Sequence, residues 1–259
     1  TVFVKDYGIH AGEKDRMNTL YLRKILEECR NTEEAAEIVF EEGTYHFYPD
    51  YAFERTLCIS NHDEDTIKRI AFDLTDCCHL AIQGKNSEFI FHTELLAFYF
   101  HNSEDITLEG FSIDYERPAY SEGTIVAVNG PSMQLRIDKK RFPYYVAHQR
   151  IFFTGENFCY EIPFWMEVDP EKGEPSEGPY EMGFDIHPRA DYGNWKELED
   201  GLVEVTLDGS GRMNPFDGYT PGHVLVLRHH PRNYPAVYVT DSKDLTFRDI
   251  RLYHCAGMG

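Results

Sequence analysis

The sequence lacks any hydrophobic run long enough to cross a membrane. No apolar stretch in its 259 residues approaches the roughly 18 residues that a membrane-spanning helix requires. Basic residues are also scarce, with 25 Lys and Arg against 45 Asp and Glu and a formal net charge of −20. Nucleic-acid affinity depends largely on Lys and Arg at phosphates, so this surface disfavours DNA, RNA and anionic membranes as partners. Neutral sugars remain compatible with such a charge.

Cysteine spacing gives no sign of a metal site. No two cysteines form a CxxC pair, and adjacent Cys77 and Cys78 would point to opposite faces of a strand. We predict small buried thiols in turns, no metal and no cofactor. The six are Cys29, Cys58, Cys77, Cys78, Cys159 and Cys255.

Only one helix is predicted, and the rest of the chain has the pattern of short strands. Apolar side chains recur at near 3.6-residue spacing over residues 17–29, and Asn31 follows as a C-terminal stop. Residues 37–40 and 43–47 have the composition of strands, and Pro49 ends the second run.

An internal repeat indicates the fold. The segment that begins at Asn102 matches the one that begins at Asp241 in its apolar positions and in its Ser, Asp and Thr. A weaker copy begins at Asp76, 26 residues before Asn102. A unit of this size buries its apolar face only by stacking on its neighbours. The repeat therefore predicts an all-β, right-handed parallel β-helix whose open end is capped by the N-terminal helix.

The second interval is too long for one coil. Asn102 and Asp241 are 139 residues apart, and the excess contains alternating strands and a strong hairpin signal at Asn129-Gly130. We predict cap and first coils over residues 1–119, an inserted small antiparallel β-barrel or sandwich over residues 120–232, and a return to the β-helix over residues 233–259. The stretch 169–192 is expected to be a long exposed loop. The inserted strands are predicted at residues 124–128, 133–137, 202–207 and 223–227.

Six segments of the chain resemble a known enzyme family. The first two resemble the N-terminal cap of pectate-lyase-like β-helices, and together the six resemble the α-1,3-galactosidases of glycoside hydrolase family 110. The inserted barrel is a feature of that family as well. The segments are VKDYG (4–8), FEEGTYHFYP (40–49), ISNHD (59–63), KRIAF (68–72), FSIDYERP (111–118) and HCAGMG (254–259).

This resemblance implies an inverting exo-enzyme that removes terminal α-1,3-linked galactose from glycans. A carboxylic acid protonates the leaving oxygen while a carboxylate opposite it activates water. The family is bacterial, and a secreted or periplasmic location is favoured. Its adjacent pair of catalytic aspartates has no counterpart here, because the sequence contains no Asp-Asp step. We therefore expect the catalytic acids beyond Gly259, and a downstream segment or second chain that completes the solenoid.

Candidate substrate-binding residues lie where the insertion departs. Asp114, Tyr115, Glu116 and Arg117 combine carboxylates, a ring and a guanidinium, which suit sugar hydroxyls and ring stacking. The alternative is a structural corner in which Arg117 pairs with Asp114 or Glu116 and Pro118 ends the strand.

His254 occupies the position in the later coil that matches Tyr115 in the earlier one. Stacking would place the two side by side at the edge of a binding groove, with a turn at Gly257 and Gly259. The alternative is a structural histidine. The acidic run at residues 63–65 favours a solvated loop over a calcium site, and His229-His230 is expected to close the insertion.

Three functions compete at this stage. The first is the galactosidase, which requires two acidic residues in a later coil on the face of Tyr115 and His254. The second is a polysaccharide lyase, which needs a Lys, Arg or Tyr base and a means of neutralising a uronate. The third is a non-catalytic carbohydrate-binding or structural β-helix module.

Overall fold

A computed structural model describes residues 1–31, 34–59, 63–162, 164–176, 193–207, 215–229 and 234–255. The chain divides into two compact units, Thr1–Pro118 together with Pro231–Gly259, and Ala119–His230. Strands dominate both units, and the helix expected over residues 17–29 is α1, Asn18–Arg30, which ends at Asn31. Within the described residues, no helix is both long and apolar enough to cross a membrane.

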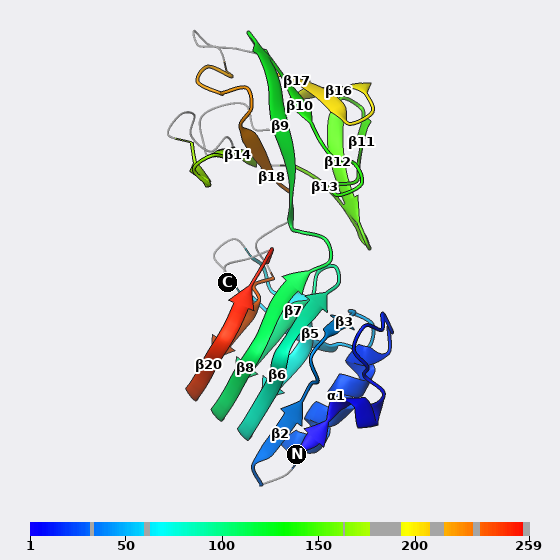
Figure 1. Ribbon diagram of the computed structural model, residues 1–259, viewed down its shortest axis with the longest axis vertical. Helices are drawn as coiled ribbons and strands as arrows, with labels where there is room; N and C mark the ends of the chain where they lie inside the picture. Colours follow the sequence, from blue (N-terminus) through cyan, green and yellow to red (C-terminus); the bar gives the residue numbers. More distant parts are fainter. Residues whose placement is uncertain are drawn as a thin grey trace. The chain divides into compact units, whose positions relative to one another are not determined.

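The first unit contains two largely parallel sheets (Figure 1). One has the order β1-β2-β6-β8-β20, with β3 also paired to β6. The other has the order β19-β7-β5-β4, in which only β4 is antiparallel to its neighbour. The first sheet comprises β1 (Val2–Phe3), β2 (Ala36–Val39), β3 (Thr44–Phe47), β6 (Cys78–Phe91), β8 (Glu104–Tyr115) and β20 (Lys243–Leu252). The second comprises β4 (Phe53–Leu57), β5 (Thr66–Thr75), β7 (Leu96–His101) and β19 (Val237–Thr240).

Strand register follows the sequence repeat. Leu80 of β6 pairs with Ile106 of β8, an offset of 26, and Leu245 of β20 pairs with the same Ile106, an offset of 139. Side chains one repeat apart hydrogen-bond across the strands, as Asn102 Nδ2 does to Asp76 Oδ1 at 2.7 Å. The repeat therefore predicts both pairings correctly, including the one that the insertion separates.

Repeated positions also share an uncommon backbone conformation. Asp76, Asn102 and Asp241 all have φ near +50°, at 56°, 50° and 48°. Asp and Asn enter this left-handed region more readily than other residues with a side chain. The repeat thus preserves a turn at the start of each long strand.

Phenylalanine rings fill the space between the two sheets. Phe72 of β5 stacks on Phe98 of β7 with centroids 4.3 Å apart, and Phe89 of β6 stacks on Phe111 of β8 at 4.5 Å. Phe98 stacks in turn on Phe111 at 5.5 Å, and all four rings are buried. Such offset ring contacts add to the hydrophobic gain from burial.

Helix α1 is joined to this core by its apolar face and by hydrogen bonds to strand ends. Leu22, Ile25 and Leu26 are fully buried in the core of the first unit. At its last turn, Arg30 donates to the carbonyls of Thr75 and Asp73, each at 2.8 Å. A 3-10 helix, η1 (Val4–Tyr7), precedes it.

The second unit contains two antiparallel sheets. The larger has the order β15-β14-β18-β9-β10-β17-β16, and the smaller is β11-β12-β13. The expected hairpin is present, since Asn129 pairs with Ser132 across a two-residue turn. The larger sheet comprises β9 (Tyr120–Asn129), β10 (Ser132–Arg136), β14 (Phe164–Asp169), β15 (Glu174–Pro175), β16 (Asn194–Glu199), β17 (Leu202–Thr206) and β18 (Val224–Arg228). The smaller comprises β11 (Tyr144–Ala147), β12 (Arg150–Gly155) and β13 (Phe158–Glu161).

The described strands of the larger sheet form an open path from β15 to β16. Two sequence expectations need correction. The stretch predicted as a loop begins with a short hairpin, because β15 pairs with the end of β14, and residues 177–192 lie outside the described residues. Of the six free thiols only Cys77 is buried, and burial raises its pKa to about 11. The other cysteines occupy partly or fully exposed positions.

Candidate functional site

Polar side chains gather where the parallel strands β3, β6 and β8 end. Phe47, Phe91 and Tyr115 are paired across these strands and point into the core. Alternation along a strand sends the preceding and following residues to the outer face. His46, His92 and Glu116 occupy those positions, so register brings together three residues that are distant in sequence.

His46 and His92 face each other at short range. His46 Nδ1 lies 3.0 Å from His92 Nε2, and the two residues are only 5% and 4% exposed. Burial lowers the pKa of His46, and the neighbouring His92 and Lys14 lower it further, while Glu116 opposes them. The low pKa favours a neutral imidazole with a lone pair on one ring nitrogen.

Residues from the start of α1 and the end of β3 hold the histidine pair in place. Tyr48 stacks on His92 with ring centroids 3.9 Å apart and an angle of 19°, and the Arg16 guanidinium lies 4.7 Å above the Tyr48 ring. Asn18 donates to the His46 carbonyl at 3.0 Å, and Thr19 Oγ1 donates to the Tyr48 carbonyl at 2.7 Å. These contacts fix the backbone at His46 and the ring of His92.

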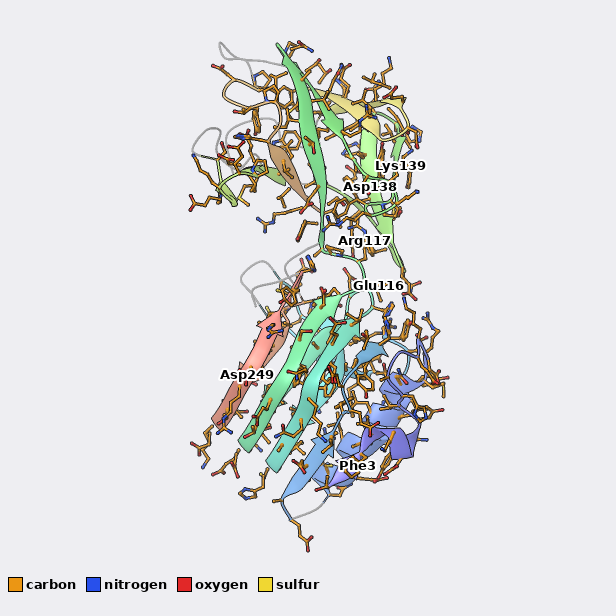
Figure 2. All side chains as sticks on the ribbon, in the orientation of Figure 1. Phe3, Glu116, Arg117, Asp138, Lys139 and Asp249 are labelled. Atoms are coloured by element: carbon orange, nitrogen blue, oxygen red, sulfur yellow. The ribbon has the colours of Figure 1, made fainter. Side chains whose placement is uncertain are left out.

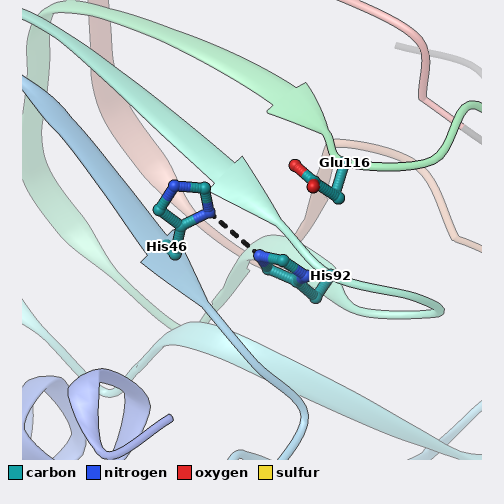
Figure 3. Close-up of side chains that lie close together, drawn as sticks. All are labelled: His46, His92 and Glu116. Atoms are coloured by element: carbon teal, nitrogen blue, oxygen red, sulfur yellow. Dashed lines mark hydrogen bonds between the residues drawn. The ribbon is translucent and has the colours of Figure 1, made fainter. Parts of the chain in front are cut away.

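Glu116 brings a carboxylate to the exposed side of the pair. One ligand atom from each of His46, His92 and Glu116 lies within 4.8 Å of the others (Figure 3). The Glu116 amide donates to the Phe91 carbonyl at 3.0 Å, and its carboxylate accepts from Lys14 at 3.4 Å. The Glu116 side chain is 48% exposed, so it can change rotamer without disturbing the core.

Asp114 and His254 form a second polar pair at the ends of β8 and β20. His254 Nδ1 lies 2.7 Å from Asp114 Oδ1, which also accepts from the Tyr115 amide at 2.7 Å. The two side chains are 30% and 32% exposed. His254 thus lies beside the end of β8, as the repeat predicts, and contacts Asp114 there.

Tyr115 is buried at the end of β8, and Arg117 is partly buried just beyond it. Tyr115 is 6% exposed and packs on Phe91 with centroids 5.9 Å apart, so its ring is not presented for sugar stacking. Within the described part of the chain its hydroxyl has no hydrogen-bond partner, and burial raises its pKa far above the ordinary value. Arg117 donates to the Pro118 carbonyl at 3.1 Å just beyond β8 (Figure 2), and burial lowers its pKa to about 10.

The remaining sequence candidates have structural positions. Asp63, expected in a solvated loop, has a fully buried side chain and accepts from Lys68 Nζ at 2.8 Å. His229 is buried and lies 3.1 Å from Ser121 Oγ through its Nε2. His230 and the turn expected at Gly257 and Gly259 lie outside the described residues.

His46 and His92 were not among the residues predicted for the site. For His92 and Glu116 the reason is that the pairing offset changes within the strand pair of β6 and β8. It is 26 at Leu80 and Ile106 but 24 at Phe91 and Tyr115, with an irregularity between Gln83 and Ser87. A constant offset of 26 would place His92 opposite Pro118 instead of Glu116. One signal was available in the sequence. An aromatic residue precedes both His92 and Glu116, and aligning these two aromatic residues places the ends of β6 and β8 side by side.

Comparison with known proteins points to one group of enzymes. Residues 121–218 match the GLAA-B beta-barrel domain I. The whole chain is 31% identical over 263 residues to alpha-1,3-galactosidase A of Shewanella woodyi, covering 41% of that protein. It is 27% identical over 261 residues to alpha-1,3-galactosidase B of Bacteroides thetaiotaomicron, covering 40% of it. A similar enzyme of Akkermansia muciniphila is 27% identical over 83% of this chain and 26% of its own length.

These similarities support the relationship to α-1,3-galactosidases that the sequence motifs indicated. The chain spans about two fifths of the length of the first two relatives. The matched barrel domain falls within the second unit, Ala119–His230.

Proposed function

We propose that this chain serves a galactosidase-type glycoside hydrolase of family 110 that removes terminal α-1,3-linked galactose from glycans. The observation that carries the proposal is similarity to curated α-1,3-galactosidases along the entire chain. The domain match at residues 121–218 adds independent support. Inversion of the anomeric carbon and exo-action are the finer parts of the proposal.

We also infer that the first unit is a right-handed parallel β-helix of the pectate-lyase-like type. Three long parallel strands, β6, β8 and β20, repeat with the offsets of the sequence pattern. Crossovers between parallel strands of one sheet are right-handed in nearly all proteins. In this assignment the second unit is a domain inserted between two coils of the β-helix.

In this proposal the Asp114 carboxylate binds sugar hydroxyls, and His254 orients that carboxylate. The carboxylate is held by the His254 imidazole and the Tyr115 amide through a single oxygen, which leaves the second oxygen available to accept from hydroxyls. Glu116 and Arg117 lie two and three residues after Asp114 and complete a polar strand end. Tyr115 supports this strand end from within the core.

Equilibrium binding of a terminal α-1,3-galactosyl disaccharide tests this assignment. Loss of a hydrogen bond to a charged group costs about 1.5–3 kcal/mol, so Asp114→Asn should weaken binding roughly tenfold or more. A matched control is Asp105→Asn, because Asp105 forms an equivalent pair with His79 Nδ1 at 2.7 Å and lies at the start of β8. Equal affinity in wild type and Asp114→Asn would contradict the assignment.

A further inference from the structure

We propose that His46, His92 and Glu116 form a binding site for a divalent transition-metal ion, with Zn²⁺ as the preferred occupant. The proposal concerns ligand binding at the end of β3, β6 and β8 and does not depend on galactoside hydrolysis. Two imidazole nitrogens and one carboxylate are the donor types that Zn²⁺ takes in sites with three protein ligands.

The spacing of the two nitrogens suits a shared ion. In a tetrahedral site with Zn–N distances near 2.0–2.1 Å, two imidazole nitrogens lie about 3.3 Å apart. His46 Nδ1 and His92 Nε2 are 3.0 Å apart and face each other (Figure 3). To hold an ion, the spacing of the nitrogens has to change by only a few tenths of an ångström, and the ion would lie beside the line that joins them.

The surroundings keep this donor pair rigid and leave the third ligand adjustable. Both imidazoles are buried, and the Tyr48 ring stacked on His92 restricts its rotation. Glu116 is half exposed, and its ligand atom already lies within 4.8 Å of both nitrogens. A rotamer change at one surface side chain would complete a three-ligand site and leave a fourth position for water.

The ligand types also discriminate between metals. Ca²⁺ and Mg²⁺ prefer sets of oxygen donors, whereas two imidazoles favour Zn²⁺ and related transition metals. Lys14 opposes any cation here, because its ammonium lies 3.4 Å from Glu116 Oε1. The Lys14 side chain is 60% exposed and competes for a carboxylate that the metal would use.

This competition gives two surface substitutions with opposite expected effects. Glu116→Gln removes a charged ligand and should weaken Zn²⁺ binding roughly tenfold or more, as losses around metal sites commonly do. Lys14→Gln removes the competing cation and should tighten binding. Both side chains are exposed, so neither change disturbs the core.

Titration of the metal-free full chain with ZnCl₂ in a calorimeter tests the proposal. We expect one strong site per chain, abolished in His92→Gln and altered in opposite directions by the two surface variants. Co²⁺ binding should give the visible absorption of a low-coordinate nitrogen and oxygen site. The control is His79→Gln, which removes an exposed histidine outside the cluster. Absence of a strong site in wild type, or binding insensitive to both His92→Gln and Glu116→Gln, would overturn the proposal.

Discussion

At the residue scale, left-handed backbone positions also recur within the long strands. Asp249 of β20 has φ +51°, and the matching residue of β8 is Gly110, with φ +74°. A left-handed conformation costs roughly 1–2 kcal/mol for ordinary residues and nothing for glycine. The side chain at this position is exposed, so backbone conformation dominates the effect of substitution there (Figure 2).

Substitution of Asp249 separates backbone strain from side-chain contacts. We expect Asp249→Gly to preserve stability and Asp249→Val to lower the free energy of unfolding by roughly 1–2 kcal/mol, because valine resists positive φ. Urea denaturation of the two variants measures the difference. Equal stability of the valine and glycine variants would show that the left-handed conformation at residue 249 is not maintained in solution.

The buried ion pair of Asp63 and Lys68 makes stability depend on pH. Burial alone would raise the pKa of Asp63, but hydrogen bonds from Lys68 and from the amides of Ile59 and Glu64 outweigh it and lower the pKa below 3.8. A carboxylate with a lowered folded-state pKa stabilises the fold above its unfolded pKa. That contribution is lost as pH falls below about 4, through the folded-state pKa.

Asp63→Asn should therefore destabilise the protein most at neutral pH. It leaves the Lys68 ammonium buried without its counterion, at a cost of roughly 3–5 kcal/mol. The difference from wild type should shrink as pH falls below about 4, measured by urea denaturation from pH 7 to pH 3. Glu54→Gln is the matched control, because Glu54 pairs with Arg69 at 3.4 Å on the surface, and such pairs contribute under about 1 kcal/mol. A pH-independent difference would refute the account.

At the element scale, strands β6 and β8 approach each other closely beside the bulge. A Cβ atom on Gly84 would meet Phe111 Cβ at 2.5 Å and the Gly110 carbonyl oxygen at 2.8 Å. Neither atom belongs to the flexible end of a side chain, so the strands would have to separate. Phe111 is part of the aromatic stack between the sheets, and the displacement would reach the core.

Gly84→Ala should consequently lower stability by roughly 1–3 kcal/mol, the usual cost of overpacking. Thermal and urea denaturation measure the loss. Ser112→Ala, at the neighbouring position of β8, serves as control and should change stability little. A fully stable Gly84→Ala protein would mean that β6 and β8 do not pair as closely as described.

Several elements could be predicted because their signals are local. The periodicity of residues 17–29 locates α1 to within one residue, and Asn129-Gly130 identifies the hairpin between β9 and β10. The histidine cluster was harder to predict, because it depends on a change of register near Gly84, and only the aromatic residues before His92 and Glu116 indicate how the strand ends align. The burial of Tyr115 follows from strand alternation and was open to prediction in principle.

At the scale of the whole molecule, the repeat specifies which distant segments pair. The 139-residue offset predicts that β20 continues the sheet of β8 despite the intervening unit. The arrangement of the strands in that unit was harder to predict from the sequence, because alternating strands are equally consistent with a barrel, a sandwich or an open sheet. Whether a sheet closes into a barrel depends on pairing between its two edge strands, and amino-acid composition does not specify that pairing.

The central proposal is that this chain serves a hydrolase that acts on terminal α-1,3-linked galactose, and time-resolved NMR of that reaction tests it most directly. A form of the protein that spans the full length of its relatives, with its intact mass recorded, is incubated with a terminal α-1,3-galactosyl disaccharide and with α-1,4- and α-1,6-linked controls. The account predicts early release of β-galactose, the inverted anomer, from the α-1,3-linked substrate alone. Failure of the folded protein to release galactose from that substrate, or early release of the α-anomer, would contradict it.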